Sequence, residues 1–511
     1  MRVLMTGGTG LIGQVTTAAL LRRGHTVRLM ARRASRTREQ WPENVEAVDG
    51  SMTDAASITR AVEGCDVIVH LASLARLVKG EPGFEEVNVE GTRTLLAAAE
   101  KAGIKRFVYI SSLGAERGKS PYHQTKHAAE KLTRGFSREW TILRPANVYG
   151  PGDEVISLLL RMVRALPVVP TVDGGQQPFQ PIWVEDVAEA IAGSIDQPDV
   201  LGRALDLAGP DTTSMDDLID RLGALTGRHP ARVSVPGFLA VLGSRAGSML
   251  GLDLPLDPGQ LTMLEEGNLL PPGAPDALRE VFHLEPTSID AGLKKLTHAL
   301  PEQLQGVGEL QHRRIWAAIE GSRLSAEELF AHFCRHFSDL TPWHVAVGSE
   351  PDCDGAVRAG ATLTMHLPLR GNVQVRVAEF TPRSATLVTV AGHPLAGAVC
   401  FRVDPDTASD GGHSFGFHIE VHERASNMID WMLMASGGST LQLVTWRQTV
   451  EHAIEASGGR APAGVQDETE ELDDERARQS ETWLRSLVDH AKRAEHEAAI
   501  ATGDLVNPPH A

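Results

Sequence analysis

The sequence predicts an α/β fold in which a doubly wound parallel sheet carries a small substrate lobe, followed by a domain of antiparallel strands and a helical tail. Three observations predict it. A short apolar strand, Met1–Met5, runs directly into a glycine-rich turn and a helix. Apolar strands then alternate with helices, as expected when both faces of a parallel sheet are buried. Beyond residue 300, several segments alternate apolar and polar residues, which is typical of half-buried antiparallel strands.

The first strand leads into Thr6–Gly13 (TGGTGLIG), with glycines at Gly7, Gly10 and Gly13, and then into a helix over Gln14–Arg22. So tight a turn needs residues without a Cβ. It also lets the backbone approach a diphosphate at a helix N-terminus, where free N–H groups favour negative charge. An ordinary strand–helix turn could use glycine as well. Its place between an N-terminal strand and a helix favours a dinucleotide site.

Further strands of this region are predicted at Val27–Ala31, Val45–Val48, Val67–Ala72 and Phe107–Ser111, with the clearest helix at Val89–Ala102. This alternation implies right-handed crossovers in one doubly wound sheet.

The end of the second strand indicates the cofactor. An acidic residue about 20 positions past the glycine turn usually bonds the ribose 2′-hydroxyl of NAD. Here the chain reads Ala31-Arg32-Arg33. Two guanidinium groups would pair with the 2′-phosphate of NADP. A solvated basic loop is the alternative, but we expect NADP, with NAD as the second choice.

Ser112 ends the fifth strand, and Tyr122 and Lys126 follow at the start of a helix. Tyr and Lys four residues apart lie on one helix face. The ammonium should lower the pKa of the phenol, which is near 10 when free, so that it can exchange a proton. Ser112 would hold the substrate oxygen. A chance pair on a surface helix is the alternative, although the chain has only three tyrosines.

Several motifs carry a family resemblance: TGGTGLIG (6–13), HLAS (70–73), VNVEGTRTLLAAAEKAGIKRFVYISS (87–112), YHQTK (122–126) and LRPANVYGPGD (143–153). With them, residues 1 to about 300 resemble the extended or atypical short-chain dehydrogenases/reductases, the epimerase-like branch with a Rossmann-type sheet. QPIWVEDVAEAI (180–191) is similar to the subgroup that includes the nucleotide-binding accessory subunit of respiratory complex I.

This resemblance implies roles by position. Ser112, Tyr122 and Lys126 would be catalytic, and Asn88 would support the fourth strand and the site. The implied cofactor-binding residues are Gly7, Thr9, Gly10, Leu11, Ile12, Gly13, Arg32, Arg33, Ser51, Met52, Ala72, Lys126 and Pro145. Two departures stand out. Ser51 replaces an acidic residue that reads the adenine amino group, and the segment between Ser112 and Tyr122 is short for a sugar-nucleotide epimerase.

The region after Leu143-Arg144-Pro145 would form the substrate lobe. A helix over Glu154–Leu166 should wall its pocket. The expected lining is apolar: Leu158, Leu159, Met162, Val168, Phe179, Phe238, Leu239 and Met249. We therefore expect hydride transfer to or from a carbonyl or alcohol of a small, rather apolar compound. Two alternatives stay open: a non-catalytic NADP(H)-binding sensor or assembly module, and a nucleotide-sugar epimerase.

A second domain is predicted at 308–458, after the first at 1–305. A strand over His312–Glu320, a helix over Ser325–Ser338 with a capping box from Ser325 to Glu328, five strands and a closing helix from about Thr440 to Ala456 make up the pattern. This order, with the fragment GHPLAGAVCFRV (392–403), resembles the helix-grip fold of the START-like, or SRPBCC, superfamily. The resemblance implies an apolar ligand or a partner surface.

Histidines are dense in this second region, among them His418 and His422, four apart on one strand. Because no structural-zinc spacing is present, we expect solvated or core histidines and predict no metal.

Residues 459–511 read as a linker and an acidic helical tail, whose helix carries an apolar stripe that includes Trp483 and Leu487. The last residues, from Asn507, are expected to be disordered.

The net charge and the cysteine pattern argue against other kinds of partner and against a disulfide-rich protein. A net charge of −17 argues against nucleic acid or anionic membrane as the main partner. The four scattered cysteines contain no CxxC, which favours a reducing, cytoplasmic setting over a disulfide framework. The chain starts with a strand, so no signal peptide is expected. The most apolar stretch, Val235–Leu256, contains Arg245 and Asp253, so we expect no membrane span.

Overall fold

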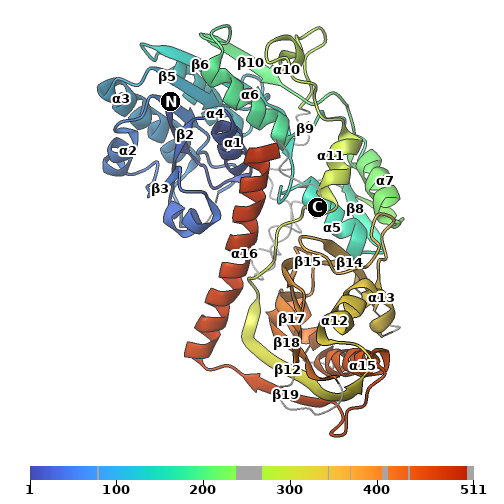
Figure 1. Ribbon diagram of the computed structural model, residues 1–511. Helices are drawn as coiled ribbons and strands as arrows, with labels where there is room; N and C mark the ends of the chain where they lie inside the picture. The colour runs from blue at the N-terminus through green and yellow to red at the C-terminus, as the bar shows by residue number, and fades with distance from the viewer. Residues whose placement is uncertain are drawn as a thin grey trace.

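The computed structural model describes residues 1–77, 80–236, 268–342, 345–368, 370–405, 413–434 and 438–502. An α/β body at the N-terminal end and an antiparallel sheet domain lie one beyond the other, and one long helix, α16 (Asp474–Thr502), runs between them (Figure 1). Phe238, Leu239, Met249, most of the apolar stretch Val235–Leu256 and the last residues from Asn507 lie outside the described residues.

The described residues of the first body form a seven-stranded parallel sheet in the order β10-β6-β5-β4-β1-β2-β3. The reversal of order beside β1 makes the sheet doubly wound, as predicted. The strands are β1 (Arg2–Thr6), β2 (Thr26–Ala31), β3 (Val45–Asp49), β4 (Val67–His70), β5 (Arg106–Ile110), β6 (Glu139–Pro145) and β10 (Arg203–Leu207).

Helices cover both faces of this sheet. Ala19 of α1 and Val187 of α6 belong to one apolar core, and Ile58 of α2, Leu95 of α3 and Ala129 of α4 belong to the other. The bounds are α1 (Leu11–Arg22), α2 (Ala55–Val62), α3 (Gly91–Ala102), α4 (Pro121–Arg134) and α6 (Val184–Asp196), with a 3₁₀ segment η1 (Ala34–Gln40) after β2. The single helix predicted at Val89–Ala102 is preceded by a π-helical turn, η2 (Glu85–Glu90).

A smaller lobe stands at the carboxyl ends of these strands. It contains β7 (Val148–Tyr149), α5 (Ile156–Ala165), β8 (Val168–Val172), β9 (Ile182–Trp183), α7 (Met215–Thr226), β11 (Ala231–Val235) and α11 (Ile289–Leu296). The short helix α10 (Ala277–Glu280) lies beside β10 instead, with Ala277 and Leu278 in the core of the parallel sheet. The lobe's own core includes Leu160, Leu222 and Leu293. This is the lobe that the sequence predicts beside the substrate.

The second domain is an antiparallel sheet. In the described residues its order is β13-β14-β15-β16-β17-β18-β12-β19, so the first long strand lies between the last two. The strands are β12 (Val307–Ser322), β13 (Ala346–Val347), β14 (Thr362–Leu367), β15 (Gly371–Thr381), β16 (Ser384–Thr389), β17 (Leu395–Pro405), β18 (His413–Ala425) and β19 (Gln466–Glu471).

The helices α12 (Ala326–Arg335), α13 (Phe337–Leu340) and α15 (Ser439–Ser457) cover one face of this sheet, and a short helix, α14 (Met428–Leu433), follows β18. The predicted capping box of Ser325 and Glu328 begins α12. Phe333, Phe401, Phe417 and Trp446 fill the space between sheet and helices. Several apolar side chains of α14, Trp431 among them, are exposed.

Part of the segment predicted as a linker and an acidic helical tail is a strand. Gln466–Glu471 pairs antiparallel with β12 as β19, and the chain then enters α16. Trp483, Leu484 and Leu487 of α16 pack on the sheet face opposite α15, and the helix continues to η1 and α1 of the first body (Figure 1).

Buried ion pairs join the two bodies. Arg164 of α5 donates from Nε to Glu350 at 2.8 Å and from Nη1 to Gln374 of β15 at 2.9 Å. Each side chain of the Arg164–Glu350 pair is only 3% exposed. Arg376 of β15 pairs with Glu302, and its Nη2 donates to the carbonyl of Leu300. Since buried charges are costly without their partners, these pairs fix how the bodies meet.

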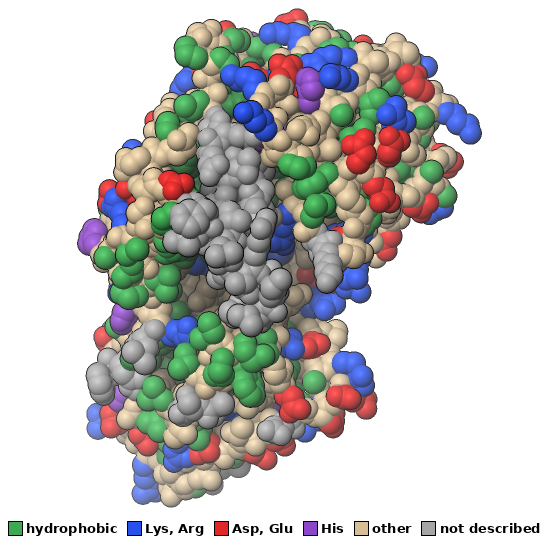
Figure 2. All heavy atoms as spheres, turned by 180° about the vertical axis from the view of Figure 1, so that it is seen from behind, with side chains coloured by type: hydrophobic (Ala, Val, Ile, Leu, Met, Phe, Trp, Pro, Cys, Tyr) green, Lys and Arg blue, Asp and Glu red, His purple; other side chains and the backbone are tan. Residues whose placement is uncertain are grey.

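Acidic and basic side chains are intermixed on the face that Figure 2 shows. In the described part of the chain, no helix combines the length and apolarity that crossing a membrane requires.

Candidate active site

The glycine turn has the geometry of a diphosphate cradle. Gly10 is the N-cap of α1, and Gly7 has a φ of +72°, which favours glycine. A Cβ on Gly13 would lie 2.6 Å from the carbonyl oxygen of Gly7, and a Cβ on Gly7 would lie 2.7 Å from the amide nitrogen of Ala72. The backbone is therefore closely packed behind the turn, while Gly10 at the N-terminus of α1, where the free N–H groups favour an anion, is exposed.

A buried histidine ties the strand ends beside this turn. His70 Nδ1 lies 2.7 Å from Thr6 Oγ1, and its Nε2 lies 2.9 Å from Thr92 Oγ1. Burial lowers the pKa of His70 to about 3. The ring is thus a neutral bridge between β1, β4 and α3.

Asn88 connects the loop after β4 to the predicted catalytic helix. Its Oδ1 accepts from the backbone N–H of Leu74 at 2.7 Å, and its Nδ2 donates to Thr125 Oγ1 of α4 at 3.1 Å. This is the supporting role that the family resemblance implies for it.

Tyr122 and Lys126 share one face of α4, which Ser120 caps and Pro121 begins. The Lys126 side chain is almost fully buried, and its Nζ donates to the carbonyl of Ile110, at the end of β5, at 2.7 Å. The same Nζ lies 5.8 Å from the centre of the Tyr122 ring. Ser112 follows Ile110 by two residues, so the side chains of Ser112 and Lys126 lie at the same end of β5.

The pKa values differ from the sequence-based expectation. Burial raises the pKa of Tyr122 to about 12, opposed by a hydrogen bond from Ser73. Burial also lowers the pKa of Lys126 to about 7. The expectation that Lys126 lowers the pKa of the phenol is wrong for this structure, because desolvation outweighs any ammonium effect. Tyr122 is therefore a protonated phenol at neutral pH.

Two further polar groups stand at this edge of the sheet. Ser111 Oγ and Asn147 Oδ1 are buried without a hydrogen-bond partner among the described residues. Buried polar groups are normally bonded, so both have capacity for a ligand. Sequence reasoning missed Asn147 and Ser73, although both lie within the motifs LRPANVYGPGD and HLAS.

The end of β2, where the adenosine of a dinucleotide is expected, is less closed. Arg32 Nη1 donates to Glu81 at 2.7 Å, and both Arg32 and Arg33 are exposed where β2 ends. Ser51 Oγ lies 2.9 Å from Thr53 Oγ1. Met52 is buried, and a Cβ on Gly91 would lie 2.9 Å from its Cβ. Met52 therefore packs the sheet, while the arginines and Ser51 remain accessible.

The predicted lining of the lobe divides into core and surface. Leu159 and Phe179 are buried in the core of the lobe, Leu158 and Met162 are partly buried, and Val168 is exposed. Thr9 lies in the glycine turn, Leu11 is the first residue of α1, and Pro145 is the last residue of β6.

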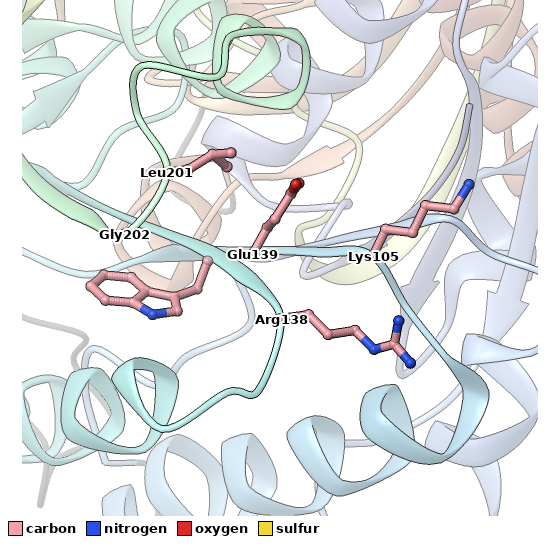
Figure 3. Close-up of a pocket in the computed structure, with 6 residues that line it drawn as sticks. Lys105, Arg138, Glu139, Leu201 and Gly202 are labelled. Carbon is pink, nitrogen blue, oxygen red and sulfur yellow. The ribbon is translucent and has the colours of Figure 1, made fainter.

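An open hollow of about 600 Å³ lies at the other edge of the sheet (Figure 3). Lys105, Glu139 and Leu201 border it, at the amino ends of β5 and β6. Cofactors of doubly wound sheets bind at the carboxyl ends of the strands, so this hollow is not the candidate site.

Residues 3–207 match the NAD dependent epimerase/dehydratase family. The match lies within the N-terminal part of the chain and spans the seven-stranded sheet. Over 202 residues the chain is 34% identical to a ceramide reductase of Caulobacter vibrioides, an alignment covering 39% of this chain and 62% of the relative. It is also 34% identical over 183 residues to a 3-beta-hydroxysteroid dehydrogenase of Mycolicibacterium neoaurum, covering 30% and 50%.

The resemblance to the complex I accessory subunit is confirmed as well. The chain is 28% identical over 242 residues to the mitochondrial NADH dehydrogenase [ubiquinone] 1 alpha subcomplex subunit 9 of Arabidopsis thaliana, covering 45% of this chain and 59% of the relative. The chain thus spans between 50% and 62% of the length of these relatives. The START-like character of the second domain stays a prediction.

Proposed function

We propose that the epimerase/dehydratase domain is an NADP-dependent oxidoreductase that moves hydride to or from a carbonyl or alcohol of a small, rather apolar compound. One observation carries this: a phenol with a raised pKa and a buried amine share one face of α4 at the carboxyl end of β5. The glycine turn, with its closely packed backbone, fits a dinucleotide.

In the reducing direction, Tyr122 Oη would donate its proton to the substrate oxygen, and Ser112 would hold that oxygen in place. Bound nicotinamide would supply the hydride, and hydride plus proton turn the carbonyl into an alcohol. The phenolate left on Tyr122 needs a counter-charge, and the ammonium of Lys126, on the same helix face, would offset part of the desolvation that raises the pKa of the phenol. In the oxidising direction the same proton and hydride transfers would take place in reverse.

The relatives support an apolar substrate. Two relatives that are 34% identical over their matched residues are enzymes named for ceramide and for 3-beta-hydroxysteroid. Exposed Arg32 and Arg33 would pair with the 2′-phosphate of NADP, for which Arg32 would leave Glu81. Ser51 would take the place of the acidic residue that reads adenine.

The test is NADPH oxidation with long-chain ketones, ketosteroids and a UDP-sugar as substrates. We expect turnover with an apolar carbonyl, lost by at least 100-fold in Tyr122→Phe, since a positioned proton donor contributes about 10²–10⁴-fold. Tyr149→Phe is the matched control, because the Tyr149 ring is buried in the core of the lobe against Trp183. Unchanged turnover in Tyr122→Phe would exclude the proposal. Epimerisation consumes no net NADPH, so the UDP-sugar is followed by chromatography of its products; conversion of the UDP-sugar alone would favour an epimerase.

Ligand binding by the second domain is a second candidate. Glu423, Arg313 and Gln442 lie buried or partly buried between β12, β18 and α15, and Gln442 Nε2 donates to Glu423 Oε2 at 2.7 Å. Glu423 Oε1, Gln442 Oε1 and Trp446 Nε1 are buried without a partner in the described part of the chain. Polar groups in such a place would receive the head of an amphipathic ligand. Native mass spectrometry of the purified protein tests this: an adduct lost in Glu423→Gln supports it.

A further inference from the structure

A cluster of two histidines and a glutamate lies on the second sheet, far from the nucleotide domain's catalytic residues in the chain. Glu420 Oε1 lies 2.8 Å from His312 Nε2 and 3.5 Å from His422 Nε2. One nitrogen from each ring and one oxygen of the carboxylate lie within 4.8 Å of one another. Three donor atoms this close can share one small cation.

The backbone holds these side chains in fixed register. His312 of β12 is directly opposite His422 of β18 on one side and Glu470 of β19 on the other. Glu420 precedes His422 by two residues, so both point to the same sheet face. The core residues Ile315, Ile419 and Val421 lie at the alternate positions, which places the cluster on the face opposite α15. Ligands on strands are positioned more firmly than ligands on loops.

The surroundings resemble a binding site more than a surface ion pair. The side chains of His312 and His422 are 10% and 12% exposed, whereas Glu420 is 35% exposed, which leaves one side open. Trp483 of α16 lies beside His422, with ring centroids 4.9 Å apart. Glu470 Oε2 stands 3.8 Å from His312 Nδ1, on the far side of that ring. A carboxylate behind a ligating imidazole orients the ring and raises its basicity.

The hydrogen bonds within the cluster leave one of its ring nitrogens without a partner. His422 Nδ1 is buried without a hydrogen-bond partner among the described residues. Arg314, the cross-strand neighbour of Glu420, bonds to Glu468 instead, and Arg476 bonds to Glu470. The positive charges nearby are thus engaged by other carboxylates.

We propose that His312, His422 and Glu420 bind one divalent transition metal ion, with Zn²⁺ as the best match. Imidazole nitrogen with one carboxylate suits Zn²⁺ and related ions, whereas Mg²⁺ and Ca²⁺ prefer sites made of oxygen. Three protein ligands leave a fourth position open on the exposed side of Glu420. This departs from the sequence-based prediction of no metal, which compared His422 with His418 on its own strand and could not pair it with His312.

A second three-residue set of this kind among the described residues makes a useful contrast. Glu116, His127 and Glu130 also lie within reach of one ion. There, however, both glutamates are bonded to Arg144, with Nε donating to Glu130 at 2.8 Å. A guanidinium already occupies the place of a cation, so that set carries no metal site.

The test is metal binding by the full chain, without a polyhistidine tag and after dialysis against EDTA. Co²⁺ is titrated while its visible d–d absorption is followed, then displaced by Zn²⁺, with Mg²⁺ as the hard-cation control. We expect one Co²⁺ per chain, displaced by Zn²⁺ and not by Mg²⁺. His312→Ala and Glu420→Gln should weaken Co²⁺ binding by at least tenfold, and Glu470→Gln by about tenfold or more.

His418→Ala is the matched control, because His418 lies on β18 four residues before His422 and outside the cluster; it should bind as the wild type does. Circular dichroism of each variant shows whether it has folded. If His312→Ala does not fold, the conservative variant Glu420→Gln tests the site in its place. Absence of bound Co²⁺ in the wild type, or equal binding by the wild type and Glu420→Gln, would overturn the proposal. Either result leaves the catalytic proposal untouched, since Tyr122 is tested separately.

Discussion

The imidazole ring of His496 lies flat on the indole ring of Trp41, with ring centroids 3.9 Å apart and planes 4° apart. His496 Nδ1 also lies 2.7 Å from the carbonyl oxygen of Gln40. Trp41 and Gln40 end η1, the segment that begins just after Arg33. A helix from the C-terminal part of the chain therefore braces the loop that we expect to select the cofactor.

We predict that His496→Ala raises the KM for NADPH several-fold with little change in kcat, because η1 loses its stacking and hydrogen-bond partner while α4 is unaffected. Stability should fall by about 1–3 kcal/mol, the cost of one buried hydrogen bond and one ring pair. Steady-state kinetics and urea unfolding measure the two effects. Glu497→Ala, which removes only an exposed partner of Arg493, is the control. A drop in stability with an unchanged KM would contradict the role in positioning.

NADPH binding should take up a proton at Lys126. The amine has a pKa of about 7 in the structure, and the negative charge of the dinucleotide favours the ammonium, so the bound value is higher. Between the two values binding gains a proton, and the affinity therefore falls as pH rises, by at most tenfold per unit. Calorimetry in buffers of different ionisation enthalpy measures this uptake. Lys126→Met should abolish it and the exposed Lys105→Met should not; a Kd that is constant from pH 7 to 9 would refute the linkage.

Glu81→Gln should tighten NADPH binding. Glu81 holds Arg32 at 2.7 Å in an exposed pair, and a neutral amide would release the guanidinium to the 2′-phosphate. Exposed pairs are worth up to about 1 kcal/mol, which is roughly fivefold in Kd. NADH, which has no 2′-phosphate, should bind as before. Fluorescence titrations with both cofactors decide it, and equal gains for NADH and NADPH would argue against Arg32 as the phosphate ligand.

Arg164→Ala should destabilise the protein by about 3–5 kcal/mol, because it leaves Glu350 buried without its counter-charge. The double variant Arg164→Met/Glu350→Leu should recover much of this loss, since two apolar side chains remove both buried charges. Arg493→Ala, from an exposed pair, should cost less than about 0.5 kcal/mol. Chemical unfolding measures all three. A loss below about 1 kcal/mol in Arg164→Ala would show that the pair does not fix the two bodies.

The first domain is readable from the sequence because its signals are local. The glycine turn, the apolar strands and the Tyr122–Lys126 spacing each lie within a few residues, and the fold confirms their placement. The pKa of Tyr122 was not readable, because desolvation depends on what the fold packs around the ring.

Other features depend on contacts between distant segments. Gln466–Glu471 (QDETEE) has no apolar alternation. It forms a strand because it can pair with the edge of β12 that β18 does not occupy, and because Arg314 supplies a counter-charge to Glu468. The meeting of His312 with His422 likewise follows from the order of strands in the sheet. No spacing within either segment predicts it.

The brace on η1 also has a consequence in time. His496 and Gln40 are 456 residues apart, so a ribosome adding about 5–20 residues per second completes η1 about 20–90 s before its partner is made. During that interval the nascent nucleotide domain must keep Trp41 from other apolar surfaces without α16. A chain that stops before Asp474 would hold a complete set of candidate catalytic residues and still lack the support of its cofactor loop.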